Sequence, residues 1–241
     1  MKLTLGILKT DDVLSELAAH YGEYPLMFER LLQLANTDPQ LQLEFVTYEV
    51  NKGIYPANLD EVDVFLMTGS KSSVYEQIAW VTKLAEFVRT LHRYKKKFIG
   101  ICFGHQMVAH ALGGRTCLAE SGWSLGAKQA KLNPDAEPNI FEGKSFNLIY
   151  SHQDQIVVPA PGTEILASTD TCPIAATGLD KHILTFQGHP EFFSDFSRAL
   201  FRLRRAVYPP KVYEAAMTSL EQNTDQYRVA KLMIDFCLAS Q

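Results

Sequence analysis

Residues 97–106 read KFIGICFGHQ, and the arrangement of the whole chain can be worked out from them. Lys97–Cys102 is a short apolar run typical of a buried strand, whereas Gly104–Leu112 favours a helix that Gly113 ends. Glycines stand two residues before and two residues after Cys102. The segment therefore predicts a sharp strand-to-helix turn with the cysteine side chain at the carboxyl edge of a sheet, where open α/β folds bind ligands.

The same order of a short apolar run and then a helical stripe occurs on the N-terminal side of this segment. The expected strands there are Leu3–Leu8, Leu41–Val50 and Val62–Met67, and the expected helices are Leu26–Ala35 and Tyr75–Lys95. Three strand-then-helix units predict an α/β protein with a mostly parallel, doubly wound open sheet.

After Gly114 the pattern changes to short alternating stretches, which predict antiparallel additions and a late return to the main sheet. These stretches are Leu125–Leu132, Phe146–Val158, Glu164–Thr169 and His182–Gln187. From Asp195 onward the chain favours helices, one of them running to Val207, with an interruption at Pro209-Pro210. We therefore expect one domain over residues 1–241, with 195–241 as a C-terminal helical extension.

Composition excludes several classes of function. The chain has 241 residues and a formal net charge of −4, so it has no positive field to collect nucleic acid or an anionic membrane. Its four cysteines include no C-x-x-C pair, and it lacks both a signal-peptide pattern and an apolar run long enough for a membrane span. We expect a soluble, reduced, cytoplasmic protein.

Cys102 is a candidate nucleophile, because the N-terminus of the helix that follows would favour its thiolate form. The alternative is a small buried hydrophobic residue at the end of a core strand, as most free cysteines are. For Cys117, Cys172 and Cys237 we expect that core role.

His189-Pro190-Glu191 follows another expected strand and offers a base with an orienting group. In an extended backbone, residues two apart project to the same side, so the Glu191 carboxylate could reach the His189 ring. Alone, the pattern also fits a solvated loop histidine or half of a metal site.

Other polar residues were assigned structural roles. His105 and His110 are five apart, a poor spacing for a shared metal, and a phosphate-binding loop of the G-x-x-x-x-G-K-[ST] kind does not occur, so we expect no metal and no cofactor. Asp11 and Asp12 are expected at a helix N-terminus, and the alternative is the mouth of a ligand site at the end of the first strand. The arginines at 198, 202, 204 and 205 give one helix a basic character, and this helical layer is the candidate surface for a partner.

Four landmarks, in the expected order over residues 40–195, give the chain a resemblance to a known family. The segment through Gln106 matches G-x-C-x-G-x-Q, and residues 189–191 match H-P-E. Residues 68–75 are similar to a glycine loop, and residues 151–154 to an S-H-x-D segment. The chain resembles the class I glutamine amidotransferases, which have a Cys-His-Glu triad and a flavodoxin-like sheet. The resemblance is nearest to the glutaminase domain of GMP synthetase and to stand-alone relatives including the γ-glutamyl peptidases.

The resemblance implies a role for each matching residue. The triad would be Cys102, His189 and Glu191, the oxyanion hole Gly69, Ser70 and Phe103, and the substrate-binding residues Gln106, Ser151, His152 and Gln153. For Gln106 the alternative is a glutamine on a helix surface. The implied reaction is hydrolysis of the γ-carboxamide of glutamine through a γ-glutamyl-cysteine thioester.

Two departures from the family pattern affect substrate identity. Ser70-Lys71 stand where the synthetase-linked relatives usually have Gly-Pro, and Gln153 stands where they usually have glycine. After Glu191 only helices are expected, so an ammonia acceptor would require a separate synthetase subunit. A γ-glutamyl peptidase acting on γ-glutamyl peptides, and more remotely a non-enzymatic redox or ligand-binding protein, remain the alternatives.

Overall fold

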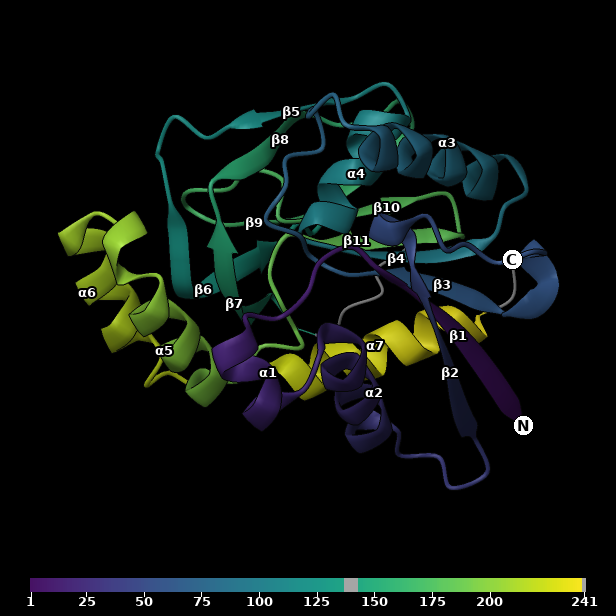
Figure 1. The fold of residues 1–241 in the computed structure, drawn as a ribbon, viewed down its shortest axis with the longest axis horizontal. Coiled ribbons are helices and arrows are strands. Elements are labelled where there is room, and N and C mark those ends of the chain that lie inside the picture. The colour runs from purple at the N-terminus through teal and green to yellow at the C-terminus, as the bar shows by residue number, and fades with distance from the viewer. Residues whose placement is uncertain (137–142, 240–241) are drawn as a thin grey trace.

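The structure is a computed structural model that describes residues 1–136 and 143–239 (Figure 1). Within these residues the main sheet has nine strands. Their order across the sheet is β2 (Gln42–Glu49), β1 (Lys2–Lys9), β3 (Val64–Met67), β4 (Lys97–Ile101), β11 (Ile183–Phe186), β10 (Ala176–Leu179), β9 (Thr163–Ser168), β6 (Ser124–Leu132) and β7 (Ser145–His152). β5 (Arg115–Leu118) and β8 (Asp154–Val158) form a separate antiparallel pair.

The first five strands of the sheet, from β2 to β11, run parallel to one another. β4 lies between β3 and β11, with Ile99 opposite Leu66 on one side and Leu184 on the other. All five residues of β4 are buried, as expected for a strand whose sheet is covered on both faces. This half of the sheet confirms the predicted doubly wound α/β architecture.

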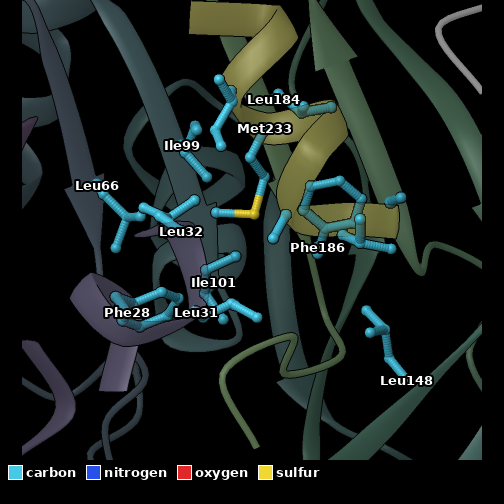
Figure 2. Close-up of a cluster of buried hydrophobic side chains, with 14 of the residues drawn as sticks. Phe28, Leu31, Leu32, Leu66, Ile99, Ile101, Leu148, Leu184, Phe186 and Met233 are labelled. Carbon is cyan, nitrogen blue, oxygen red and sulfur yellow. The ribbon is translucent and has the colours of Figure 1, made fainter. Parts of the chain in front are cut away.

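Helices cover both faces of the parallel strands (Figure 1). α2 (Tyr24–Ala35) and α7 (Gln226–Leu238) lie on one face, and α3 (Ala79–Arg93) and α4 (Phe103–Ala111) lie on the other. Phe28, Leu31 and Leu32 of α2 meet Met233 of α7 over the strands (Figure 2). Their spacing in α2 is that of one helical stripe, so burial of this face positions both helices against β4.

The remaining helices are shorter or lie away from the parallel strands. They are α1 (Ser15–Tyr21), α5 (Ser194–Leu203), α6 (Pro210–Ser219) and three 3₁₀ helices at Val50–Lys52, Leu59–Glu61 and Arg205–Val207. None of the helices in the described residues has both the length and the apolar character that a membrane span requires.

The antiparallel half was predicted less precisely. The stretch 146–158 was expected as one strand, yet the chain changes direction at Gln153, so that β7 joins the main sheet and β8 pairs with β5. β5 and β10 were not predicted, because four residues that are mostly polar or small carry little alternation.

The predicted C-terminal layer is divided in two. α7 covers the parallel strands with α2, whereas α5 and α6 lie beside β6 and β7 at the antiparallel end of the sheet (Figure 1). The helix expected to reach Val207 ends at Leu203, and Pro210 then begins α6. Residues 240 and 241 of the predicted extension lie outside the described part of the chain.

Helix α3 also begins later than expected, at Ala79 rather than near Tyr75. Ile78, which the expected helix included, lies just before it and is exposed. The residues that precede α3 therefore belong to the loop that follows β3, at the carboxyl edge of the sheet.

Candidate active site

Cys102 stands between β4 and α4 in a backbone conformation that side chains rarely adopt, with φ 51° and ψ −98°. The two flanking glycines make this turn possible. A Cβ on Gly100 would stand 2.7 Å from the carbonyl group of Gly104, and a Cβ on Gly104 would stand 2.9 Å from the carbonyl oxygen of Met67. A side chain at either position would therefore collide with the main chain. The backbone conformation of Cys102 is strained, as is typical of functional sites.

Two glutamines hold the Cys102 side chain from the sheet side. Gln187, just after β11, directs Nε2 toward the Cys102 sulfur at 3.5 Å. Gln106 donates from Nε2 to Gln187 Oε1 at 3.1 Å and to the carbonyl oxygen of Asp154 at 2.8 Å. Gln106 is buried, so the alternative of a helix-surface glutamine is wrong.

His189 and Glu191 form a buried pair beside this turn. Nδ1 of His189 lies 2.8 Å from Oε1 of Glu191. The His189 main chain donates to the carbonyl oxygen of Ile149 at 2.8 Å, which fixes the segment to β7. The imidazole stacks on Phe192, with ring centroids 4.0 Å apart and planes at 11°. Hydrogen bonding and stacking together set the orientation of the ring.

The environment of His189 favours its protonated form. Burial alone would lower its pKa, but the charges of Glu191 and Cys102 outweigh burial and raise the pKa of His189 to about 10. Nε2 of His189 is buried and makes no hydrogen bond of ordinary length within the described residues. The two charged neighbours therefore favour the imidazolium, whose Nε2–H lies on the side away from Glu191.

The predicted site residues gather around one cavity of about 400 Å³. Its lining includes Cys102, His189, Gly69, Ser70, Gln106, Ser151, His152 and Gln153. The two other predicted residues lie immediately behind it. Glu191 is covered by His189, and Phe103 is the first residue of α4, so its main-chain N–H has no acceptor within the helix.

His152 is held as a neutral side chain. Its Nδ1 lies 2.8 Å from the carbonyl oxygen of Asp154, so Nδ1 carries the hydrogen. Burial lowers the pKa of His152 to about 3. Nε2 is consequently an acceptor, and it is buried at the cavity without a hydrogen-bond partner among the described residues.

Asp154 connects two walls of the cavity. Its carboxylate accepts hydrogen bonds from the hydroxyls of Ser73 and Tyr75, in the loop that follows β3. Its carbonyl oxygen accepts from Gln106 and His152. The loop that carries Gly69 and Ser70 is thereby fastened to the start of β8.

Asp11 and Asp12 line the cavity as well, so their assignment to a helix N-terminus was wrong. α1 begins only at Ser15, and both aspartates belong to the loop after β1. Asp11 accepts from the main-chain and side-chain nitrogens of Lys71, each at 2.9 Å. Asp12 pairs with Lys9.

Several residues of the site were not predicted. Gln187 directly precedes Gly188-His189, so its place at a strand end was a usable signal. Trp123 and Arg204 reach the cavity only because the residues before β6 and after α5 are brought to it from the antiparallel end of the sheet. No pattern in one sequence relates those segments to Cys102.

A cysteine at a strained turn, an imidazole and a buried carboxylate at the carboxyl edge of a doubly wound sheet are typical of acyl-transfer enzymes that use a thiol. Over the described residues there is no group of three histidine, cysteine or acidic side chains arranged to hold a metal ion.

Comparisons with known proteins identify the family. The family model described as glutamine amidotransferase class-I matches residues 31–201. A glutamine amidotransferase-like protein of Schizosaccharomyces pombe is 32% identical, covering 99% of this chain and 100% of its own. Gamma-glutamyl peptidase 3 of Arabidopsis thaliana is 28% identical over 73% of each chain. The crystal structure of a glutamine amidotransferase from Methylobacillus flagellatus has a TM-score of 0.75 at 17% identity, covering 99% of this chain and 95% of that one, which establishes the fold. The protein belongs to the class I glutamine amidotransferase family.

Proposed function

We propose that the protein hydrolyses the γ-carboxamide of glutamine through a γ-glutamyl-cysteine thioester, with Cys102, His189 and Glu191 as the catalytic triad. The observation that carries this proposal is the placement of a strained, cavity-lining Cys102 beside a His189 that is ion-paired to buried Glu191. The family supports the same reaction. We also propose that residues 1–241 act as one domain, since α7 and α2 share one face of the sheet.

In the first half of the reaction the Cys102 thiolate attacks the γ-carbonyl carbon, and a C–S bond forms. The imidazolium of His189 then gives its Nε2 proton to the departing nitrogen as the C–N bond breaks. Ammonia leaves, His189 becomes neutral, and the γ-glutamyl group remains as a thioester on Cys102.

In the second half neutral His189 takes a proton from water, and the hydroxide oxygen bonds to the thioester carbon. The C–S bond breaks, which restores the thiolate and releases glutamate. Glu191 orients the imidazole and stabilises the imidazolium at both stages, because its Oε1 lies 2.8 Å from Nδ1.

The oxyanion formed in each half would be bound by main-chain N–H groups of Phe103 and Ser70. Phe103 begins α4, whose N-terminus carries partial positive charge, and Ser70 follows Gly69 in the loop fastened by Asp154. A donor of this kind contributes about 10²–10³-fold to the rate.

The remaining cavity residues would bind the amino-acid end of the substrate. Neutral His152 presents an unpartnered acceptor, which suits the α-ammonium group of glutamine. Ser151, Gln153 and Gln106 complete this side, and the substitution of Ser70-Lys71 for the usual Gly-Pro places additional polar groups at the mouth.

A γ-glutamyl peptidase is the second candidate, because one observation favours it. The cavity of about 400 Å³ is within the range of sites that hold ligands larger than one amino acid. The two candidates share the same triad and thioester and differ only in the leaving group. An amidotransferase would in addition pass its ammonia to a synthetase partner. The free Cys102 thiol suits a reducing compartment such as the cytoplasm.

The test is turnover by the purified chain of glutamine and of γ-glutamyl dipeptides, with Cys102→Ala as the inactive variant. We expect Cys102→Ala to remove turnover of both substrates while leaving thermal unfolding within a few degrees of wild type. Mass spectrometry of acid-quenched wild type should show the γ-glutamyl adduct on Cys102. Retained hydrolysis in the variant would overturn the proposal.

A further inference from the structure

Arg204 is a cation of the cavity wall that is left without an acidic partner. It follows α5, and its guanidinium lies over the rings of Trp123 and Tyr208, at 5.7 and 6.0 Å from their centroids. Among the described residues no carboxylate lies within ion-pair distance of it, whereas Lys71, the lysine of the lining, is paired with Asp11. Aromatic stacking holds the guanidinium at the cavity and leaves its N–H groups available.

Packing places Arg204 on the same side of the cavity as His189. Leu200, one turn earlier on α5, lines the cavity and is buried in one hydrophobic cluster with Phe192 and Tyr208. Phe192 stacks on His189 with one face and packs near Tyr24, with ring centroids 6.3 Å apart. Burial raises the pKa of Tyr24, and the charge of Arg204 acts on the same phenol in the opposite direction.

The side of the cavity determines which part of a substrate Arg204 meets. In the proposed reaction His189 protonates the departing nitrogen, so the leaving group lies on the side of His189. Ammonia carries nothing that a guanidinium would bind. An amino acid or peptide leaving group ends in a carboxylate, which is the group that a guanidinium binds through two parallel hydrogen bonds.

We propose that Arg204 binds a carboxylate of the leaving group, so that the preferred substrates are γ-glutamyl amino acids or short γ-glutamyl peptides with a free C-terminal carboxylate. This inference rests on the proposed function and extends it from the reacting bond to the substrate class. Arg204 is on this view a specificity-determining residue for the side of the substrate that departs.

The first experiment compares kcat/KM for γ-glutamyl-alanine and for γ-glutamyl-alanine amide, which differ only in the terminal carboxylate. For wild type we expect a preference for the acid of about 10–100-fold, the usual value of a hydrogen-bonded charge pair. Arg204→Met keeps the length of the stem but removes the charge, and it should reduce the preference to about one. Arg204→Lys should restore part of it.

The matched control is Arg202→Met, in the last turn of α5, where the side chain is exposed and outside the cavity lining. It should leave the ratio of acid to amide as in wild type. Equal losses on acid and amide in Arg204→Met would show a structural effect and overturn the proposal, as would a wild-type ratio near one.

A binding measurement separates this proposal from the proposed function. Calorimetric titration of Cys102→Ala with the same acid and amide needs no turnover. A preference for the acid that disappears in the double variant Cys102→Ala, Arg204→Met supports the role of Arg204, even if wild type hydrolyses neither compound and the proposed function fails. Equal affinity for acid and amide overturns the role of Arg204, even if wild type hydrolyses both.

Discussion

Gly69 lies directly against the ring of His189: a Cβ at this glycine would stand 3.0 Å from Cε1 of the imidazole and 3.6 Å from Cβ of Cys102. The imidazole is therefore confined between the glycine loop on one side and Phe192, stacked at 4.0 Å, on the other. The absence of a side chain at residue 69 allows the loop after β3 to approach the site closely. This contact gives Gly69 a role in positioning His189. That role is separate from the one proposed for the main-chain N–H of Ser70 in the oxyanion hole.

Gly69→Ala should therefore reduce catalysis more than it reduces stability. The added methyl group must displace the imidazole by a few tenths of an ångström, and misplacement of a catalytic group costs about 10–100-fold in kcat/KM. Overpacking should cost about 1–3 kcal/mol in the free energy of unfolding. Gly178→Ala is the control, because its Cβ would meet only a side-chain methyl of Leu166 at 3.4 Å. Equal kinetic losses in both variants would contradict the positioning role.

Glu191→Gln should lower the pKa of His189. In wild type the folded-state pKa of about 10 exceeds the ordinary value of about 6.5, because the charges of Glu191 and Cys102 outweigh burial. The ion pair thus contributes its full stability below about pH 6.5 and loses it as the pH rises toward 10. Without the Glu191 charge, the lowering of the pKa by burial is offset less, so the pKa of His189 falls. Nitrogen-detected NMR of the His189 ring between pH 5 and 10 measures the shift, and kcat should fall by about 10²–10⁴-fold. An unchanged titration would show that Glu191 does not hold the imidazolium.

Alkylation should distinguish Cys102 from the other cysteines. Burial raises the pKa of the Cys172 and Cys237 thiols to about 12, so both should react slowly with iodoacetamide. Cys117 is more exposed than Cys102, so exposure alone predicts that Cys117 reacts first. We expect the opposite order, because Cys102 lies beside the imidazolium of His189. Peptide mapping after short reaction times gives the rates, and faster labelling of Cys117 would count against an activated Cys102.

Asp154→Asn should loosen the loop after β3 without unfolding the protein. The carboxylate accepts from Ser73 and Tyr75 and so fastens the segment that carries Gly69 and Ser70. Asparagine retains one acceptor oxygen but not the charge, and each charge-assisted bond contributes about 1.5–3 kcal/mol. We expect faster hydrogen exchange at residues 70–75 and a kcat reduced by about tenfold. Tyr75→Phe, which removes a single bond, should give a smaller change of the same kind. Unchanged exchange in Asp154→Asn would show that other contacts hold the loop.

The parallel half of the fold could be predicted because its signals are local. β1, β3 and β4 are largely apolar, buried runs, and residues 26–35 have the helical spacing that α2 confirms. The two glycines around Cys102 likewise predict the sharp turn, because each stands where the main chain of a nearby residue leaves no room for a side chain.

The antiparallel half and the far wall of the cavity could not be predicted, because they depend on long-range packing. The chain turns at Gln153, so the two halves of the alternating stretch 146–158 belong to different sheets. Asp11 and Asp12 looked like residues of a helix N-terminus, yet the cavity position of Asp11 is set by Lys71, sixty residues later. Arg204 appeared to belong to a basic helix face, and only the packing of α5 beside Trp123 brings it to the cavity.

The buried His105 provides a test of the fold that is separate from catalysis. Its Nε2 lies 3.0 Å from the carbonyl oxygen of Ile174 and its Nδ1 lies 2.6 Å from the Thr185 hydroxyl. The neutral ring can therefore donate a hydrogen bond to Ile174 and accept one from Thr185. Burial lowers the pKa of His105 to about 4. The unfolded chain gains a proton at this residue below about pH 6.5 and the folded chain does not, so its contribution to stability is complete above pH 6.5 and is lost as the pH falls toward 4.

His105→Gln keeps a donor and an acceptor but cannot titrate. It should cost about 1–3 kcal/mol at pH 7.5, and the free energy of unfolding should fall less steeply between pH 6.5 and 4.5, by about 1.4 kcal/mol per pH unit. Urea unfolding at four pH values measures how the free energy of unfolding changes with pH in wild type and in the variant. All other titrating groups are the same in both proteins. Parallel curves would show that His105 is not held neutral.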